Sequence, residues 1–157
     1  ASISIRDELE ALKLYLELET IRFKGKFKWE VTVDEEIDTL LYRVPTMLIQ
    51  PFVENSLVHG LMNKDNGEGF VGIDLRLYDE FILCTIEDNG IGREKAMKNT
   101  EEKNGNHNSL GTKITESRLK LVNSLYGNNM RIKYTDLRDE NGEATGTRVE
   151  ISIPVVG

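Results

Sequence analysis

Between residues 71 and 88 the chain contains two alternating apolar segments, and these constrain its fold more than any other feature. Residues 71–78 and 81–87 each alternate in side-chain character, and Asp79-Glu80 joins them. This pattern is typical of an antiparallel hairpin with one face turned toward a core. A sheet with one buried face needs a second layer to cover it, so the rest of the chain must supply that layer.

The other periodic segments predict both layers. Alternation predicts further strands over three ranges: 28–33, 130–137 and 147–154. Helical spacing of apolar residues predicts three amphipathic helices: 4–23, 45–62 and one that ends near Tyr126. In the second of these, Pro45 is expected to open the helix and Pro51 to bend it. The predicted fold class is α+β, a two-layer sandwich with helices on one face of a mainly antiparallel, mixed sheet.

Composition excludes several functions. The net charge of -7 argues against a nucleic-acid surface, because such a surface needs basic residues to neutralise phosphates. The single cysteine, Cys84, lies in an apolar segment and is expected to be a buried thiol. No apolar segment approaches the roughly 20 residues of a membrane-spanning helix. The chain is therefore expected to form one folded domain that lies in the cytoplasm and binds no nucleic acid.

Three short polar clusters lie where regular structure meets a loop. The first is residues 54–60, where Asn55 and His59 are four residues apart and would share one face of an α-helix. The second begins at Asp88, which ends the apolar face of a predicted strand and is followed by Gly90 and Gly92. A buried carboxylate needs a hydrogen-bond donor, which an adenine amino group would supply.

The third cluster lies at the start of the last predicted helix. It consists of Ser109, Leu110, Gly111 and Thr112. Free backbone N–H groups at a helix start favour phosphate oxygens. The preceding residues 91–109 hold many asparagines and few large apolar side chains, so they are expected to form a mobile lid that ATP and magnesium would order.

Each cluster alone has an ordinary structural explanation. Asp-Asn-Gly is a common turn, and a histidine on a helix is usually at the surface or satisfied in a core. The order of the clusters is more informative. A helix bearing Asn55 precedes the strand that ends in Asp88, then come the loop, a helix, and a last strand opened by Gly146-Thr147.

This order resembles the Bergerat-fold ATPases, which include histidine kinases, DNA gyrase and certain chaperones. Within them the chain is most similar to the LytS-like sensor histidine kinases. Residues 8–23 are similar to the linking helix of that branch, and residues 45–60 resemble its N box. Residues 88–92 resemble the G1 box and residues 107–119 the G2 region.

The resemblance implies a binding site for ATP and Mg²⁺. It implies that Asn55 coordinates magnesium and that Asp88 accepts a hydrogen bond from the adenine amino group. Gly90 and Gly92 would shape the pocket, and Thr147 would join a water network around adenine.

The remaining implied roles concern the phosphates. Gly111 and its neighbours Ser109, Leu110 and Thr112 would contact the triphosphate. Glu54 would position a water molecule or orient Asn55, and His59 would face the phosphates or serve in packing or capping. Two positions depart from the family. Val58 stands where a basic residue is frequent, and Ser109 replaces the first glycine of the G2 box.

The implied activity is transfer of the ATP γ-phosphoryl group to a histidine. That histidine would lie on an upstream dimerisation helix of the same receptor. Residues 1–24 would be the linking helix and residues 25–157 the catalytic domain. The whole receptor is expected to be a homodimer, with any membrane anchor upstream, and to pass its phosphoryl group to a response regulator. Two alternatives stay open at this point, a nucleotide-sensing module that transfers nothing and a protein-interaction domain with a vestigial pocket.

Overall fold

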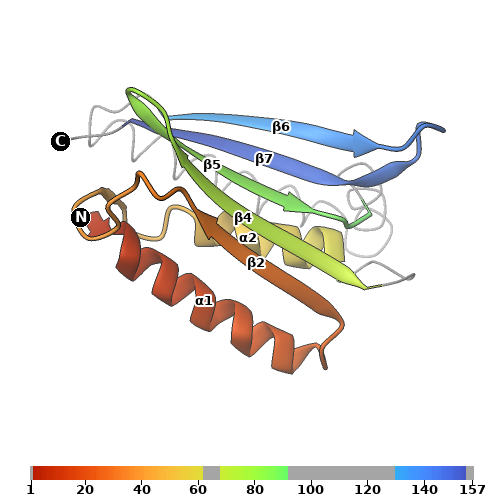
Figure 1. The fold of residues 1–157 in the computed structure, drawn as a ribbon. Coiled ribbons are helices and arrows are strands. Elements are labelled where there is room, and N and C mark those ends of the chain that lie inside the picture. The colour runs from red at the N-terminus through yellow and green to blue at the C-terminus, as the bar shows by residue number, and fades with distance from the viewer. Residues whose placement is uncertain (1, 62–67, 92–129, 155–157) are drawn as a thin grey trace, which may run out of the picture.

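A five-stranded mixed sheet forms the centre of the fold (Figure 1). The computed structural model describes residues 2–61, 68–91 and 130–154, with His59 and Gly60 described by their backbone only. The strands are β2 (Phe27–Val33), β4 (Gly69–Leu77), β5 (Phe81–Asp88), β6 (Arg131–Arg138) and β7 (Ala144–Pro154). Their order is β2-β4-β5-β7-β6. The β2–β4 pair is parallel and the other pairs are antiparallel, which confirms the predicted mixed sheet.

Helical elements cover one face of this sheet. Helix α2 (Gln50–Asn55) continues directly into η1, a π-helix over Ser56–Leu61, and η1 contacts β4, β5 and β7. Helix α1 (Ile5–Arg22) runs beside β2 at the lower edge of the molecule in Figure 1. The predicted two-layer α+β architecture is confirmed. None of the described helices is long and apolar enough to span a membrane.

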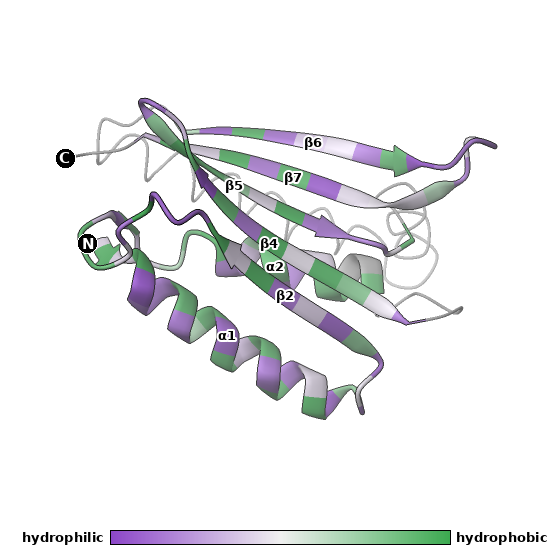
Figure 2. Ribbon diagram, viewed as in Figure 1, coloured by the Kyte–Doolittle hydropathy of each residue, from purple (hydrophilic) through white to green (hydrophobic). Residues whose placement is uncertain are grey.

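The core lies between the sheet and the helices. Alternate residues of the central strands point into it, and Figure 2 shows this alternation as green bands along the strands. The fully buried strand residues include Val71, Ile73, Leu75, Ile86, Cys84 and Ile151. Helices α1 and α2 add Leu12, Leu16 and Val53. Cys84 is buried as predicted, and burial raises the pKa of its thiol to about 12.

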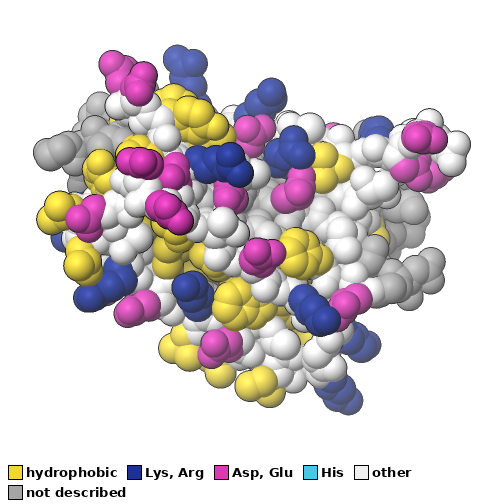
Figure 3. All heavy atoms as spheres, in the orientation of Figure 1, with side chains coloured by type: hydrophobic (Ala, Val, Ile, Leu, Met, Phe, Trp, Pro, Cys, Tyr) yellow, Lys and Arg dark blue, Asp and Glu magenta, His cyan; other side chains and the backbone are white. Residues whose placement is uncertain are grey.

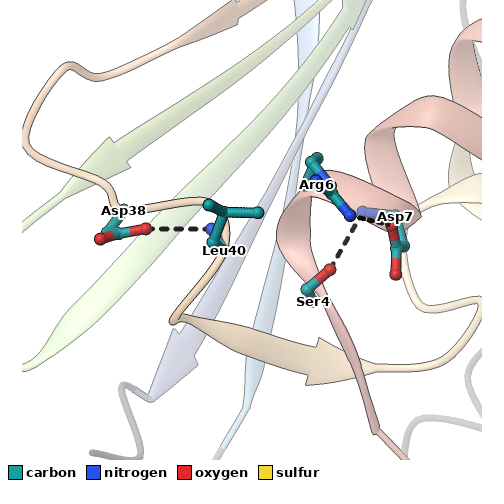
Figure 4. Close-up of polar contacts among 5 residues, drawn as sticks. All are labelled: Ser4, Arg6, Asp7, Asp38 and Leu40. Carbon is teal, nitrogen blue, oxygen red and sulfur yellow. Dashed lines mark hydrogen bonds and ion pairs between the residues drawn. The ribbon is translucent and has the colours of Figure 1, made fainter.

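The first turn of α1 is held by its own cap and by a neighbouring loop. Ser4 Oγ accepts a hydrogen bond from Asp7 N at 3.2 Å, and Figure 4 shows this cap beside the Asp38–Leu40 turn. The Ile5 and Arg6 N–H groups donate to the carbonyls of Tyr42 and Thr39. The first N–H groups of a helix have no partner within it, so these contacts fix where α1 begins.

A small two-stranded sheet was not expected from the sequence. Strands β1 (Ser2–Ser4) and β3 (Arg43–Pro45) pair antiparallel at the start of α1. The prediction that Pro45 opens a helix is therefore wrong, since Pro45 ends β3. Helix α2 starts only at Gln50, and Pro51 lies in its first turn instead of bending its interior. Proline suits that position because its missing N–H would have no helical partner there.

The segment between β3 and α2 is tied to α1 by a buried carboxylate. Met47 has a positive φ of 59°, and its N–H donates to Glu8 Oε2 at 3.1 Å. Glu8 is only 3% exposed, so this bond gives a partner to a buried polar group that would otherwise be costly to bury. The contact fixes the path of the chain into α2, and α2 carries the first polar cluster.

Candidate nucleotide-binding site

The site is centred on Asp88, the last residue of the central strand β5. Its side chain points to the core face with Ile86 and Cys84, and it is 4% exposed. It lies opposite Thr147 of β7 and Val71 of β4 in the sheet register. Figure 1 shows the same end of β5 near the end of the α2–η1 helix. The predicted placement of a carboxylate at the end of an apolar strand face is confirmed.

Asp88 accepts hydrogen bonds from three parts of the protein. Gly90 N donates to Asp88 Oδ1 at 2.9 Å. The Ser56 hydroxyl on η1 and the backbone of Thr147 also bond to this carboxylate. The protein itself thus supplies donors to the buried Asp88, and the predicted hydrogen bond from an adenine amino group stays a prediction. A carboxylate offers about four acceptor positions, so these contacts still leave room for one further donor.

Burial controls the charge of this carboxyl. Desolvation raises the pKa of Asp88 to about 6, and the neighbouring Glu87 raises it slightly. The bonds from Gly90, Ser56 and Thr147 oppose the rise, because they stabilise the ionised form. Glu87 itself faces the other side of the sheet, where Arg148 lies 2.8 Å from its Oε1. Asp88 is thus a mostly ionised buried acceptor at neutral pH that titrates just below it.

Replacing Ser56 with alanine tests the hydroxyl contact. We expect Ser56→Ala to raise the pKa of Asp88 above about 6, because one bond that favours the ionised form is lost. The free energy of unfolding should fall by about 1 kcal/mol, the usual value of one such hydrogen bond. Carbon-detected NMR titration of the Asp88 carboxyl measures the shift. An unchanged pKa would show that Ser56 does not bond to the carboxylate in solution.

Gly146 allows the end of β5 to approach β7 closely. A Cβ at Gly146 would lie 1.9 Å from the Asp88 carbonyl oxygen and 3.1 Å from Asn89 Cα. Its φ of +153° is also one that other residues rarely adopt. The glycine before Thr147 is therefore required by the backbone contact that places Asp88.

Asn89 joins the ends of two strands beneath the site. Its Oδ1 accepts from Phe70 N at 2.7 Å and its Nδ2 donates to the Glu68 carbonyl at 3.1 Å. Asn89 N also donates to the Phe70 carbonyl. These bonds fasten the start of β4 to the segment after β5. They hold the turn that carries Gly90 in a fixed position against Asp88.

The first cluster lies across the junction of α2 and η1. Asn55 is the last residue of α2, and Glu54 Oε1 accepts from Gln50 Nε2 at 3.2 Å one turn earlier. Glu54 also lies close enough to Tyr15 of α1 to affect the pKa of its phenol. Burial raises the pKa of Tyr15, and the carboxylates of Glu19 and Glu54 raise it further. Glu54 and Asn55 are both half-buried. They directly precede η1, whose Ser56 hydroxyl bonds to Asp88.

The spacing argument for Asn55 and His59 assumed an α-helix, and the structure differs. The backbone passes into a π-helix at Ser56, whose wider turn changes the directions of successive side chains. Ser56 and Leu57 are buried there, while Val58 is 47% exposed. The His59 side chain lies outside the described part, so its predicted position toward the phosphates stays a prediction.

Several predicted contacts cannot be placed in the described part of the chain. They concern Gly92, the expected lid over residues 91–109, the phosphate cluster Ser109, Leu110, Gly111 and Thr112, and the helix ending near Tyr126. Apart from Ile91, every residue of these segments lies outside the described part of the chain. The described residues bring together Asp88, Gly90 and Thr147, and Asn55 directly precedes Ser56, which bonds to Asp88; the roles of these residues toward base and metal stay predictions.

Sequence reasoning assigned no role to three residues that shape this site. Ser56 stands inside the first cluster, Asn89 inside the second, and Gly146 directly before Thr147. For Asn89, strand alternation was an available signal, because it places this side chain on the opposite face from Asp88. For Ser56 and Gly146 the role depends on contacts with a distant segment, and no local pattern reveals it.

Comparison with known proteins gives one consistent family. No protein-family model matches the chain. It is 30% identical over 153 residues to the sensor histidine kinase YpdA of Escherichia coli (strain K12), covering 97% of this chain and 24% of that protein. It is 29% identical over 135 residues to the sensor histidine kinase/phosphatase LytS of Staphylococcus aureus (strain MRSA252), covering 84% of this chain and 21% of that protein.

A solved structure supports the same assignment at the level of the fold. The catalytic domain of histidine kinase ThkA superposes with a TM-score of 0.60 at 13% identity, covering 98% of this chain and 94% of that one. The chain thus spans about a quarter of its curated relatives but nearly all of a solved catalytic domain. By sequence the chain is similar to sensor histidine kinases of the LytS kind, and the segment seen here has the fold of a histidine kinase catalytic domain.

Proposed function

We propose that this chain binds ATP with Mg²⁺ and transfers the γ-phosphoryl group to a histidine on another segment of the same receptor. The observation that carries the proposal is Asp88, a buried acceptor held by Ser56, Gly90 and Thr147 at the end of the central strand. The sequence relatives, named as sensor histidine kinases, support the same activity.

In this proposal Asp88 selects the base. An amino group of adenine donates one hydrogen bond to the free acceptor position of the carboxylate. The ionised form makes the stronger, charge-assisted bond, so the raised pKa of Asp88 limits base binding at acid pH. Gly90 has no side chain to block a flat ring, and Thr147 lies opposite Asp88 on β7 to hold bridging water.

Asn55 is the proposed metal ligand. Among residues 2–61, 68–91 and 130–154, no group of three or more His, Cys, Asp or Glu side chains could hold a metal ion alone. That fits Mg²⁺ bound with a nucleotide, which takes one or two protein oxygens and completes its shell with phosphates and water. Bound magnesium would neutralise charge on the phosphates. The carboxylate of Glu54, one residue before, would orient the amide of Asn55.

The chemical step needs little covalent work from the protein. The bond between the γ-phosphorus and the β,γ-bridging oxygen breaks, a bond from the imidazole nitrogen to phosphorus forms, and ADP leaves. Catalysis is then mainly positioning and charge neutralisation. His59 and the cluster Ser109, Leu110, Gly111 and Thr112 are the proposed phosphate contacts. The dimeric state of the receptor, the response regulator and a membrane anchor upstream belong to this proposal too.

The experiment is to supply γ-labelled ATP and Mg²⁺ to the chain together with the segment of its receptor that contains the accepting histidine. Acid-labile, alkali-stable labelling of that segment is the expected result. Tight ATP binding without labelling would favour a nucleotide-sensing module instead. Failure to bind any adenine nucleotide would favour an interaction domain with a vestigial pocket.

Asn55→Ala separates the metal contact from the base contact. We expect this change to weaken magnesium-dependent ATP binding by roughly tenfold while adenosine binding stays nearly the same, because the amide meets the metal and not the base. Calorimetry with ATP, with and without Mg²⁺, and with adenosine measures the difference. Equal losses for both ligands would place Asn55 outside the metal shell.

A further inference from the structure

Helix α1 has two apolar stripes on nearly opposite faces. The inner stripe is buried in the core and consists of Ile5, Leu9, Leu12 and Leu16. The outer stripe is exposed and consists of Ala11, Leu14, Leu18 and Ile21. Leu14 and Leu18 are each 58% exposed and Ile21 is 76% exposed. Figure 3 shows apolar side chains along the lower edge, where α1 runs in Figure 1.

The outer stripe has the spacing of a coiled-coil seam. Its members are separated by three, four and three residues, so Ala11 and Leu18 take the a positions and Leu14 and Ile21 the d positions of two heptads. In the same frame the inner stripe occupies the b and f positions. The core therefore uses the face of α1 that a coiled coil would leave unused. The outer stripe needs no change of the fold to meet a partner.

The charges beside the seam select a parallel partner. In a parallel pair, a g residue of one helix lies near the e residue of the next heptad on the other helix. Glu17 at g would meet Arg22 at e of the second copy, twice by symmetry. In an antiparallel pair, g faces g, so Glu10 and Glu17 would oppose the same charges. Arg22 lies 3.6 Å from Glu19, but it is 71% exposed, so that pair contributes little and is readily exchanged.

We propose that this outer stripe is a docking surface for α1 of a second copy of the chain, in parallel orientation. The inference is independent of nucleotide binding, since none of its residues belongs to the Asp88 site. Two heptads are short, so the pairing of the isolated chain is weak and adds to contacts elsewhere in a longer receptor. Like residues of the two copies meet across the seam, a with a and d with d.

Cysteine cross-linking tests both the contact and its orientation. The native Cys84 is fully buried, so it contributes little background. We expect Leu14→Cys and Leu18→Cys each to form disulfide-linked dimers under mild oxidation, roughly tenfold or more faster than Lys13→Cys. Lys13 is a matched control, because it is exposed on the same helix but lies outside the seam.

Charge reversal gives an independent readout in the Leu18→Cys background. Glu17→Arg should slow cross-linking, because it faces Arg22 of the second copy, and the double change Glu17→Arg with Arg22→Glu should restore it. Cross-linking of Leu14→Cys no faster than Lys13→Cys would overturn the docking surface. Faster linkage between Leu14→Cys and Leu18→Cys chains in a mixture than within either alone would overturn the parallel orientation. Unchanged calorimetric ATP binding by these variants separates this result from any failure of the proposed nucleotide site.

Discussion

Replacing Asp88 with asparagine is expected to weaken ATP binding roughly ten- to a hundredfold while the protein stays folded. The amide keeps one acceptor oxygen and places an NH₂ group where the other oxygen was. That NH₂ would face the adenine amino group or one of the donors Gly90 and Ser56. Leaving buried donors unpaired costs about 1–3 kcal/mol, which is the expected loss of binding free energy.

The fold is expected to survive this change because two effects on stability oppose each other. Asparagine removes a buried charge whose desolvation is unfavourable, and it also removes an acceptor for protein donors. The carboxyl group of Asp88 has a folded pKa of about 6 against an ordinary 3.8, so the folded state holds its proton more tightly than the unfolded chain does. The stability gained from this proton is fully present below about pH 4 and is lost as the pH rises through about 6. Asp88→Asn should remove that pH dependence.

Calorimetry and denaturation across pH 5–8 check both expectations. ATP binding by the unaltered protein should tighten as the pH rises through about 6, since the ionised Asp88 is the better acceptor. Glu87→Gln is the matched control, because it makes the same chemical change on the opposite face of β5, where Glu87 pairs with Arg148. Equal ATP affinity of a folded Asp88→Asn variant would reduce Asp88 to a turn residue.

The sheet and the first helix could be predicted because their side-chain periods are long and unbroken. Strand β5 alternates over its whole length, and α1 repeats its buried residues from Ile5 to Leu16, over about three turns. Each period follows from backbone geometry alone. The outer stripe of α1 is different, since it formed no part of that helical pattern and only the exposure of its residues in the structure reveals it.

The connection between β2 and α2 could not be predicted for a physical reason. Strands β1 and β3 have three residues each, which is too few for a period to show. The positive φ at Met47 depends on the carboxylate of Glu8 from α1 and on no residue nearby in sequence. The position of Pro45 therefore gave a wrong prediction of the helix start. Helix α2 starts at Gln50, and Pro51 lies in its first turn.

The candidate site was predictable in its residue types and less so in its contacts. Asp88 at a strand end and Asn55 on a helix follow from local pattern, and both lie where the sequence placed them. The π-helix that brings Ser56 to Asp88 is a single widened turn, and one turn leaves no periodic signature. The partners of Asp88 come from three separate segments, so only the folded sheet reveals them.

Replacing Gly146 with alanine is expected to produce the largest loss of stability of any single change considered for this protein. The new methyl group would lie 1.9 Å from the Asp88 carbonyl oxygen, which belongs to backbone and cannot rotate away. Strand β5 or β7 must shift, and overpacking of this kind costs about 1–3 kcal/mol or more. The φ of +153° adds a cost of about 1–3 kcal/mol for a residue with a side chain.

Gly142→Ala separates the steric contact from the backbone conformation. Gly142 also has a positive φ, +79°, but a Cβ there would have no atom within 4 Å. Its substitution should cost about 1–2 kcal/mol from conformation alone. Chemical denaturation of both variants should therefore show a clearly larger loss for Gly146→Ala. Because the shift moves the backbone of Asp88, any folded fraction of that variant should also bind ATP more weakly. Equal losses of stability would mean that β5 and β7 are farther apart in solution, and that Gly146 has no part in placing Asp88.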